Sequence, residues 1–232
     1  MDSSEIQNLA DLESVHWWYL LRSESVTKWS CSLPLGSRIL DVGSASGGNT
    51  ILLSELGFEL TSLEMSDLGV ELQQSRGIGV VRGDATNLPF ESASFDAVLC
   101  LDVLEHIEDD VSALKEMYRV TKPGGKFLFS VPEDPRLWSD HDRAVSHVRR
   151  YIRKDFENKI STVGFRISHT SSSVVFLKWP IKIYRLFVKG SSLKKENPLI
   201  NWALYKLGQF ERVAVPSKIS GVTLWSEGYK PK

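Results

Sequence analysis

The chain has 232 residues, 42% of them hydrophobic, and a formal net charge of −1. This length supports one good-sized hydrophobic core but hardly two, which argues against several independent domains. The charge is uneven, because residues 176–232 hold 11 Lys or Arg against 3 Asp or Glu, while the preceding residues hold 17 against 26. A basic end favours an anionic partner or a membrane surface, and a solvated face explains it equally well.

Targeting and membrane-spanning signals are not evident in the sequence. The first residues lack the basic and apolar regions of a secretory signal, and the two cysteines have no metal-ligand spacing. The most apolar stretch, 174–188, is interrupted by Lys178, Lys182 and Arg185, so it falls short of the roughly 20 apolar residues of a membrane-spanning helix. We therefore expect a cytoplasmic protein without disulfides.

Strands and helices are predicted to alternate along the chain. Apolar runs predict strands at 38–42, 58–63, 79–82, 95–101, 126–131, 165–171 and 219–225. Amphipathic or capped stretches predict helices at 50–56, 66–77, 109–120 and 154–163. This order predicts an α/β fold with a seven-stranded, mostly parallel sheet, helices on both faces and an antiparallel last strand.

A glycine-rich loop, Asp41-Val-Gly-Ser-Ala-Ser-Gly-Gly, follows the first strand, and its glycines let the backbone approach a ligand closely. Glu64 ends the second strand about 20 residues beyond the loop, where an acid accepts hydrogen bonds from ribose hydroxyls in nucleotide-binding folds. Asp84 and the Ala85 amide follow the third strand and are suited to an adenine. Together these residues predict a ligand that contains adenosine. A dinucleotide also contains adenosine, and the glycine-rich loop alone would suit one as well.

The ordered motifs resemble those of class I S-adenosylmethionine-dependent methyltransferases. They are Asp41-Val-Gly-Ser-Ala-Ser-Gly, Glu64, Gly83-Asp-Ala-Thr-Asn-Leu-Pro-Phe, Phe95-Asp-Ala-Val, Asp102-Val-Leu-Glu-His-Ile and Lys122-Pro-Gly-Gly-Lys-Phe. The resemblance implies a Rossmann-like sheet, S-adenosyl-L-methionine as cofactor and S-adenosyl-L-homocysteine as product. The cofactor-binding residues are then expected to be Asp41, Gly43, Ser44, Ala45, Gly47, Glu64, Met65, Gly83, Asp84, Ala85, Leu101 and Asp102.

Four residues of these motifs carry a further expectation. Ala45 departs from the family, which usually has glycine there. Asp41 is expected to tie down the loop rather than to touch the ligand. Glu105 and His106, within the fourth-strand motif, are expected at the start of a helix and not in catalysis.

Polar and charged residues crowd the segment after the fifth strand, in Leu137-Trp-Ser-Asp-His-Asp and His147-Val-Arg-Arg-Tyr. Because ligands collect at the carboxyl ends of parallel strands, we expect this segment and the aromatic His16-Trp-Trp-Tyr to border the acceptor. Both segments resemble those of a bacterial subgroup of class I methyltransferases.

The candidates for a catalytic base are His141, Asp142 and His147. The candidates for acceptor binding are Trp17, Trp18, Trp138, Arg149, Arg150 and Tyr151. Hydrogen bonds that pin the loop to the sheet would explain each of them equally well. A metal site made of His141, Asp142 and His147 is not expected, because nothing in the sequence fixes their geometry.

The single domain, 1–232, divides into an N-terminal cap at 1–30, a cofactor-binding core at 36–131, an acceptor-side segment at 132–173, a helical lid insertion at 174–216 and a last strand at 217–232. In the lid, a helix from Pro180 would place Lys182, Arg185 and Lys189 on one face and Ile181, Tyr184 and Val188 on another, and a second amphipathic stretch runs from 199 to 210. We expect this lid to shape an apolar pocket and to rest transiently on a membrane surface. A homodimer interface would use the same residues.

The predicted function is methyl transfer to a small-molecule, lipid-linked or glycan acceptor. A catalytically silent methyltransferase-like binding domain is an alternative. An NAD-dependent oxidoreductase is a further alternative, which would call for a catalytic Tyr-x-x-x-Lys or a separate substrate domain. A nucleic-acid substrate is not expected, because the chain lacks an Asn-Pro-Pro-Tyr-type motif for a flipped base.

Overall fold

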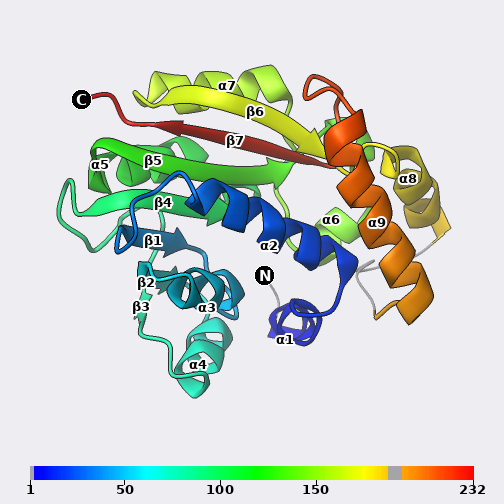
Figure 1. Cartoon of the computed structure of the whole chain (residues 1–232), viewed down its shortest axis with the longest axis horizontal. Coiled ribbons are helices and arrows are strands. Elements are labelled where there is room, and N and C mark those ends of the chain that lie inside the picture. Colours follow the sequence, from blue (N-terminus) through cyan, green and yellow to red (C-terminus); the bar gives the residue numbers. More distant parts are fainter. Residues whose placement is uncertain (1–2, 188–194) are drawn as a thin grey trace.

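The computed structural model describes residues 3–187 and 195–232, so Val188 and Lys189 of the expected lid helix lie outside the described residues. Seven strands form one sheet in the order β3-β2-β1-β4-β5-β7-β6 (Figure 1). Their bounds are β1 Arg38–Val42, β2 Glu59–Glu64, β3 Val80–Arg82, β4 Phe95–Leu101, β5 Thr121–Pro132, β6 Arg166–Ser173 and β7 Thr223–Tyr229. Strand β7 is antiparallel to β5 and β6, and the other paired strands are parallel, which confirms the predicted fold class.

The helices cover both faces of this sheet (Figure 1). They are α1 Ser3–Leu12, α2 Trp17–Ser30, α3 Gly48–Glu55, α4 Asp67–Ser75, α5 Asp110–Val120, α6 Asp140–Ala144, α7 Arg153–Thr162, α8 Lys178–Phe187 and α9 Pro198–Ala214, with short 3-10 turns η1 Leu104–His106 and η2 Pro135–Leu137. One apolar cluster joins α5 and α7 to the sheet, and a second joins α2 and α3 to it. None of the helices in 3–187 and 195–232 is long and apolar enough to cross a membrane.

Strand β5 begins five residues earlier than expected, because Thr121 already pairs with Phe95 of β4. The pairing register then shifts, and the next pair is Ala97 with Lys126. Lys122-Pro-Gly-Gly, which was predicted to lie between the helix at 109–120 and the strand at 126–131, belongs to β5 instead. Gly124 keeps the left-handed backbone of a turn at a φ of 79°, and its amide donates to the Lys230 carbonyl. Pairing between distant strands, which local turn chemistry cannot report, decides this boundary.

The insertion between β6 and β7 forms α8 and α9, and α9 packs along α2 (Figure 1). Gly208 permits the close approach of these two helices, because a Cβ there would overlap the Leu21 side chain. Asn201 of α9 accepts a hydrogen bond from the Trp17 amide at 2.7 Å and donates one to the Val15 carbonyl at 2.8 Å. The N-terminal helices and the insertion therefore form one connected layer.

The apolar face of α8 borders the cavity as expected, and Arg185 of the predicted basic face does so too. Ile181 and Tyr184 lie in the cavity wall, and Arg185 is buried beside them. Lys178 is also buried, with its Nζ 2.7 Å from Asp134 Oδ2. Lys178 and Arg185 point inward because carboxylates, Asp134 and Asp142, lie near them there.

The C-terminal end of β7 gives the first prediction. Gly228 lies against β6, and a Cβ there would overlap the Arg166 carbonyl oxygen, which belongs to the backbone and cannot rotate away. We expect Gly228→Ala to lower the free energy of unfolding by about 1–3 kcal/mol in urea denaturation. Gly79→Ala is the control, because no atom lies within 4 Å of the added Cβ. Equal losses in the two variants would contradict this account of the strand contact.

Candidate active site

A cavity of about 820 Å³ opens at the carboxyl ends of β1, β4 and β5. The glycine-rich loop and η1 form one part of its wall, and α1, α2, the segment around α6, α8 and α9 form the rest. Of the residues predicted from the sequence, its wall contains Gly43, Ser44, Ala45, Leu101, Asp102, Trp17, Trp18, His141, His147 and Arg150. Residues from both the predicted cofactor side and the predicted acceptor side therefore border one space.

The glycine-rich loop is held by the end of β2. The amides of Gly43 and Ser44 donate to the Leu63 carbonyl, and the Ala45 amide donates to Glu64 Oε2 at 2.8 Å. The other oxygen of Glu64 accepts the Ser66 amide at 2.8 Å. Glu64 thus has a structural role that the sequence did not predict, and its carboxylate keeps further lone pairs for a ligand.

Asp41 is buried outside the cavity wall and holds α3, whereas it was expected to tie down the loop itself. Its Oδ2 accepts a hydrogen bond from Thr50 Oγ1 of α3 at 2.8 Å. Burial raises the pKa of Asp41 to about 6, although this hydrogen bond opposes the shift. Asp41 therefore connects β1 to α3.

The predicted adenine-side residues lie next to Glu64 at the ends of β2 and β3. The Gly83 amide donates to the Glu64 carbonyl at 3.1 Å, which places the end of β3 beside that of β2. Asp84 and Met65 are exposed, Ala85 is buried, and Asp84 Oδ1 accepts the Thr86 amide at 2.8 Å. These residues and Gly47 lie outside the cavity wall.

Arg22 is a site residue that the sequence reasoning missed. It projects from α2 into the cavity wall and forms an ion pair with Asp102, 80 residues away. Asp102 has a left-handed backbone with a φ of 53°, and Ser130 Oγ donates to its Oδ1 at 2.9 Å. An isolated arginine in a helix gives no sequence signal of such a role.

This pair of opposite charges fits the amino-acid end of S-adenosylmethionine. A guanidinium suits its carboxylate, and an aspartate suits its ammonium group. A cavity of about 820 Å³ falls within the roughly 300–1,000 Å³ of small-molecule sites. Glu64 and Asp84 lie outside its wall, and their carboxylate oxygens are acceptors of the kind that adenosine hydroxyl and amino groups require. The residues present therefore fit this cofactor.

On the acceptor side, Asp142 is the centre of a buried network. Its side chain has no exposed surface and accepts hydrogen bonds from Arg150 Nε at 2.7 Å and from the Ser139 amide at 2.9 Å. Its Oδ1 lies 3.0 Å from His147 Nδ1. Burial alone would raise the pKa of Asp142, but the hydrogen bond with His147 and the charge of Arg150 outweigh it and hold this pKa well below its usual range. Asp142 therefore positions His147 and does not itself face the cavity.

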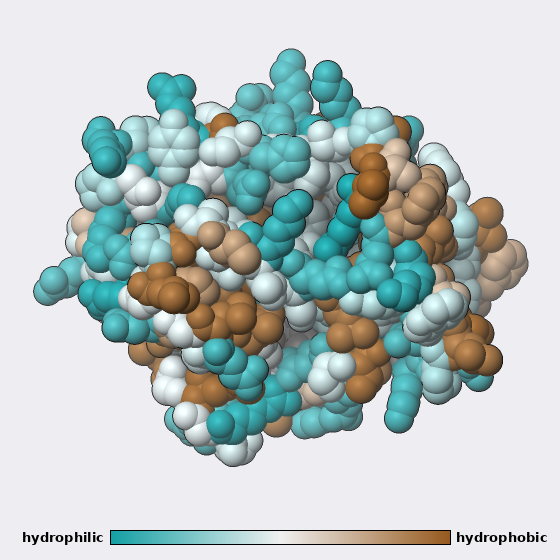
Figure 2. All heavy atoms as spheres, viewed as in Figure 1, coloured by the Kyte–Doolittle hydropathy of each residue, from teal (hydrophilic) through white to brown (hydrophobic). Residues whose placement is uncertain are grey.

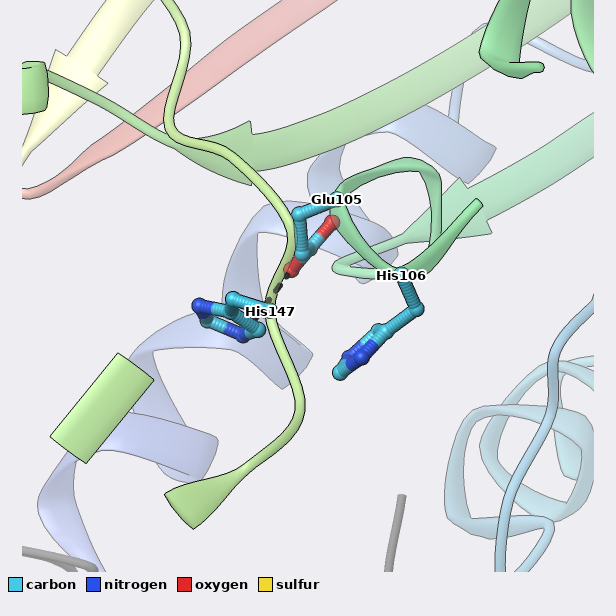
Figure 3. A group of neighbouring side chains, drawn as sticks. All are labelled: Glu105, His106 and His147. Carbon is cyan, nitrogen blue, oxygen red and sulfur yellow. Dashed lines mark ion pairs between the residues drawn. The ribbon is translucent and has the colours of Figure 1, made fainter. Parts of the chain in front are cut away.

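Glu105 and His106 were expected only to start a helix, and this expectation is incomplete. They lie on η1 in the cavity wall and face His147, whose Nε2 is 3.7 Å from Glu105 Oε1 (Figure 3). Burial, followed by the charge of Asp102, raises the pKa of Glu105 well above its ordinary value. The His106 ring stands 4.8 Å from the His147 ring between centroids, and burial lowers the pKa of His106 to about 4.

His141 completes the group of histidines in the cavity wall. Its ring centroid lies 6.4 Å from that of His147, and burial, with Arg185 nearby, lowers the pKa of His141 to about 3. Both histidines named as candidate bases thus border the cavity.

Trp138, Arg149 and Tyr151, by contrast, lie outside the cavity wall. Arg149 is held 3.0 Å from Asp110 Oδ2, and the Tyr151 hydroxyl donates to the same carboxylate at 2.7 Å. These two side chains brace the segment from behind, so the structure does not support acceptor contacts for them.

A Tyr-x-x-x-Lys spacing does occur in the chain, at Tyr118 and Lys122. Both residues lie outside the cavity wall, and Lys122 Nζ is 2.6 Å from Asp96 Oδ1. The spacing therefore does not form an oxidoreductase site here.

Comparison with known proteins assigns the family. The methyltransferase domain family matches residues 40–129. The uncharacterized methyltransferase YcgJ of Bacillus subtilis (strain 168) is 34% identical over 180 residues, which are 70% of this chain and 69% of that protein. The chain therefore belongs to the S-adenosylmethionine-dependent methyltransferase family, and S-adenosylmethionine is the cofactor of this family.

Other relatives match a smaller part of their own length. Demethylmenaquinone methyltransferase of Mycobacterium sp. (strain KMS) is 37% identical over 42% of this chain and 44% of its own. Phthiotriol/phenolphthiotriol dimycocerosates methyltransferase 1 of Mycobacterium ulcerans (strain Agy99) is 32% identical over 60% of this chain and 55% of its own. The chain thus spans about half the length of these two relatives.

A solved structure shows the same fold. Haemonchus contortus phosphoethanolamine N-methyltransferase 2, in complex with S-adenosyl-L-methionine, superposes with a TM-score of 0.65. The two chains are 20% identical, and the match covers 91% of this chain and 52% of that one.

The departure at Ala45 gives the second prediction. Ala45 has a φ of 48°, a left-handed conformation that costs a residue with a Cβ roughly 1–2 kcal/mol. We expect Ala45→Gly to raise the free energy of unfolding by up to about 1 kcal/mol and to leave affinity for S-adenosylhomocysteine intact. Ala45→Val is the matched opposite change, because a β-branched residue tolerates this backbone poorly, and both properties should fall. Urea denaturation and titration calorimetry measure them, and equal behaviour of the two variants would contradict the expected strain.

Proposed function

We propose that the protein transfers a methyl group from S-adenosylmethionine to a lipid-like acceptor with an apolar body and one reactive polar atom. The observation that carries this proposal is the single cavity that joins the glycine-rich loop to the histidine cluster beneath α8 and α9. A donor and an acceptor bound in one enclosed space need only alignment and the removal of a proton.

In this proposal the cofactor is held at both of its ends. Arg22 binds the carboxylate and Asp102 the ammonium group of its amino-acid part, while Glu64 and Asp84 accept hydrogen bonds from the ribose and the adenine. When bound, S-adenosylmethionine supplies a methyl group activated by the sulfonium. The cap formed by α1 and α2 excludes water from this end of the cavity.

The acceptor lies between the loop and the lid. Asp142 holds His147 so that Nε2 is directed toward Glu105 and the cavity, where it receives the proton that a hydroxyl acceptor loses. His141 and Arg150 line the same part of the wall. Trp17 and Trp18 of the cap border it too, which supports membership of the subgroup with an N-terminal His-Trp-Trp and a His-x-Arg-Arg-Tyr segment.

Cofactor binding tests this proposal first. In titration calorimetry we expect saturable binding of S-adenosylmethionine and S-adenosylhomocysteine. Arg22→Ala, Glu64→Ala and Asp84→Ala should each weaken binding by about 1.5–3 kcal/mol, or roughly 10- to 150-fold, because each removes a charge-assisted hydrogen bond. Glu64→Ala should also lower the melting temperature, since it frees the Ala45 amide, whereas Glu59→Ala at the opposite end of β2 is a control without effect. No heat with either ligand, together with saturable binding of NAD, would contradict the proposal.

A lipid-like acceptor is supported by the composition of the lid side. The cavity wall there contains the apolar side chains of Leu177, Ile181, Leu204 and Val222. Two relatives carry lipid acceptors in their names, demethylmenaquinone and phthiotriol dimycocerosates. Release of S-adenosylhomocysteine in the presence of short-chain quinol or long-chain diol analogues would identify which class is methylated.

The outer surface of the lid supports transient contact with a membrane, from which such an acceptor would enter. Figure 2 shows apolar side chains at the end of the molecule that α8 and α9 form. Leu186 and Phe187 are 72% and 82% exposed on α8, and Leu199 and Trp202 are 78% and 61% exposed on α9. Exposed apolar side chains beside basic ones are the composition of an interfacial helix.

Vesicle co-sedimentation tests this contact. We expect the protein to bind anionic vesicles at low salt and the double variant Leu186→Ser, Phe187→Ser to bind at least about tenfold more weakly, because burial of each side chain contributes on the order of 1.5–3 kcal/mol. Leu35→Ser is the matched control, since Leu35 is 81% exposed in the turn before β1. Absence of binding to anionic vesicles, combined with a dimer that buries Trp202 and Phe187, would assign the surface to self-association instead.

A further inference from the structure

We propose that Glu105, His106 and His147 form a binding site for one divalent transition-metal ion in the wall of the cavity. One ligand atom from each residue can be chosen so that all three lie within 4.8 Å of one another (Figure 3). Glu105 and His106 are neighbours on η1, and His147 comes from the facing loop after α6. The fold therefore brings a two-histidine, one-carboxylate set to a single point.

Both imidazoles are oriented as metal ligands usually are. The Nδ1 of His147 is 3.0 Å from Asp142 Oδ1, and the Nδ1 of His106 is 3.1 Å from the Ser146 carbonyl oxygen. An acceptor at Nδ1 places the proton there and leaves the Nε2 lone pair available to a cation. In metal sites such outer partners set the tautomer and the direction of the ring.

Glu105 supplies the independent observation that points to a ligand. Its side chain has no exposed surface, and within the described part of the chain neither of its oxygens has a hydrogen-bond partner. A buried carboxylate without donors is unfavourable unless it takes up a proton or a cation compensates it. Asp142, also fully buried, has Arg150, His147 and Ser139 as partners, so the difference lies in what Glu105 faces.

The donor set indicates the kind of ion. Imidazole nitrogens with one carboxylate suit Zn²⁺, Mn²⁺, Fe²⁺ or Co²⁺, whereas Mg²⁺ and Ca²⁺ prefer sites made of oxygen alone. At a metal–ligand distance of about 2.1 Å, two ligand atoms are about 3–4 Å apart, so small side-chain rotations close the set around an ion. The ion would keep open positions toward the cavity, because three protein ligands leave room for an acceptor atom.

This site deepens the proposed function, on which its role in the reaction rests. An acceptor hydroxyl bound to the ion would lose its proton to water, and its oxygen would form the bond to the methyl carbon while the carbon–sulfur bond breaks and its electron pair stays on sulfur. His147 would then be a ligand rather than a base. The site favours an oxygen acceptor, such as a phenol or an alcohol, since a cation lowers the pKa of a bound hydroxyl.

Metal binding can be measured without any acceptor. The full chain, freed of any histidine tag and stripped with a chelator, is titrated with Co²⁺ by absorption spectroscopy and with Zn²⁺ and Mg²⁺ by calorimetry. We expect one Co²⁺ or Zn²⁺ per chain and much weaker binding of Mg²⁺. His106→Ala, His147→Ala and Glu105→Gln should each weaken Co²⁺ binding more than about 100-fold, beyond what loss of an outer partner does. His169→Ala is the control, because His169 is exposed on β6 and lies outside the cavity wall.

Two further measurements keep the outcomes distinct. Thermal unfolding shows whether each variant is folded, and Glu105→Gln, which preserves shape, decides the matter if a histidine variant does not fold. The metal site is overturned if the wild-type protein binds no ion stoichiometrically. It is also overturned if the three variants bind the ion as tightly as the wild type does. Calorimetry with S-adenosylhomocysteine is run in parallel. If the wild-type protein does not bind this nucleotide, the proposed function fails, whereas a metal site measured in the same protein still stands.

Discussion

The buried carboxylate of Asp142 is the interaction on which the acceptor side of the molecule depends. A charge without exposed surface is tolerated only when its lone pairs are filled, and Arg150, His147 and the Ser139 amide fill them. Arg150 also donates to the Glu133 carbonyl, and the Glu133 carboxylate accepts the Gly221 amide at 2.7 Å. One network thus fixes the loop after β5, the direction of the His147 ring and the base of the lid.

The cap and the lid are connected to each other as firmly as to the sheet. Glu24 of α2 binds Arg212 of α9 at 2.8 Å, and Asn201 of α9 bonds both Trp17 at the start of α2 and Val15 two residues before it. Both the cap and the lid contribute residues to the wall of the cavity, so these contacts join its two sides.

Hydrogen bonds from the protein itself hold the glycine-rich loop. Glu64 holds the Ala45 amide, and the Leu63 carbonyl holds the two amides before it. Preorganisation of this kind improves affinity because little conformational entropy is lost. The left-handed backbone at Ala45 is strained for a residue with a Cβ. The chain tolerates this strain because hydrogen bonds to the end of β2 fix the shape of the loop.

The sequence by itself determined the order of strands and helices along the chain, the antiparallel last strand and the residues of the cofactor loop, because periodicity, glycine positions and strand-end acids are local signals. Only the tertiary structure decided which distant side chains meet. It placed Arg22 against Asp102 and Glu105 against His147, and it turned Arg185 of α8 inward. An amphipathic pattern states that a helix has two faces, but the charges and cavities of neighbouring elements decide which face is buried. For the same reason Arg149 and Tyr151, expected at the acceptor, contact Asp110 instead.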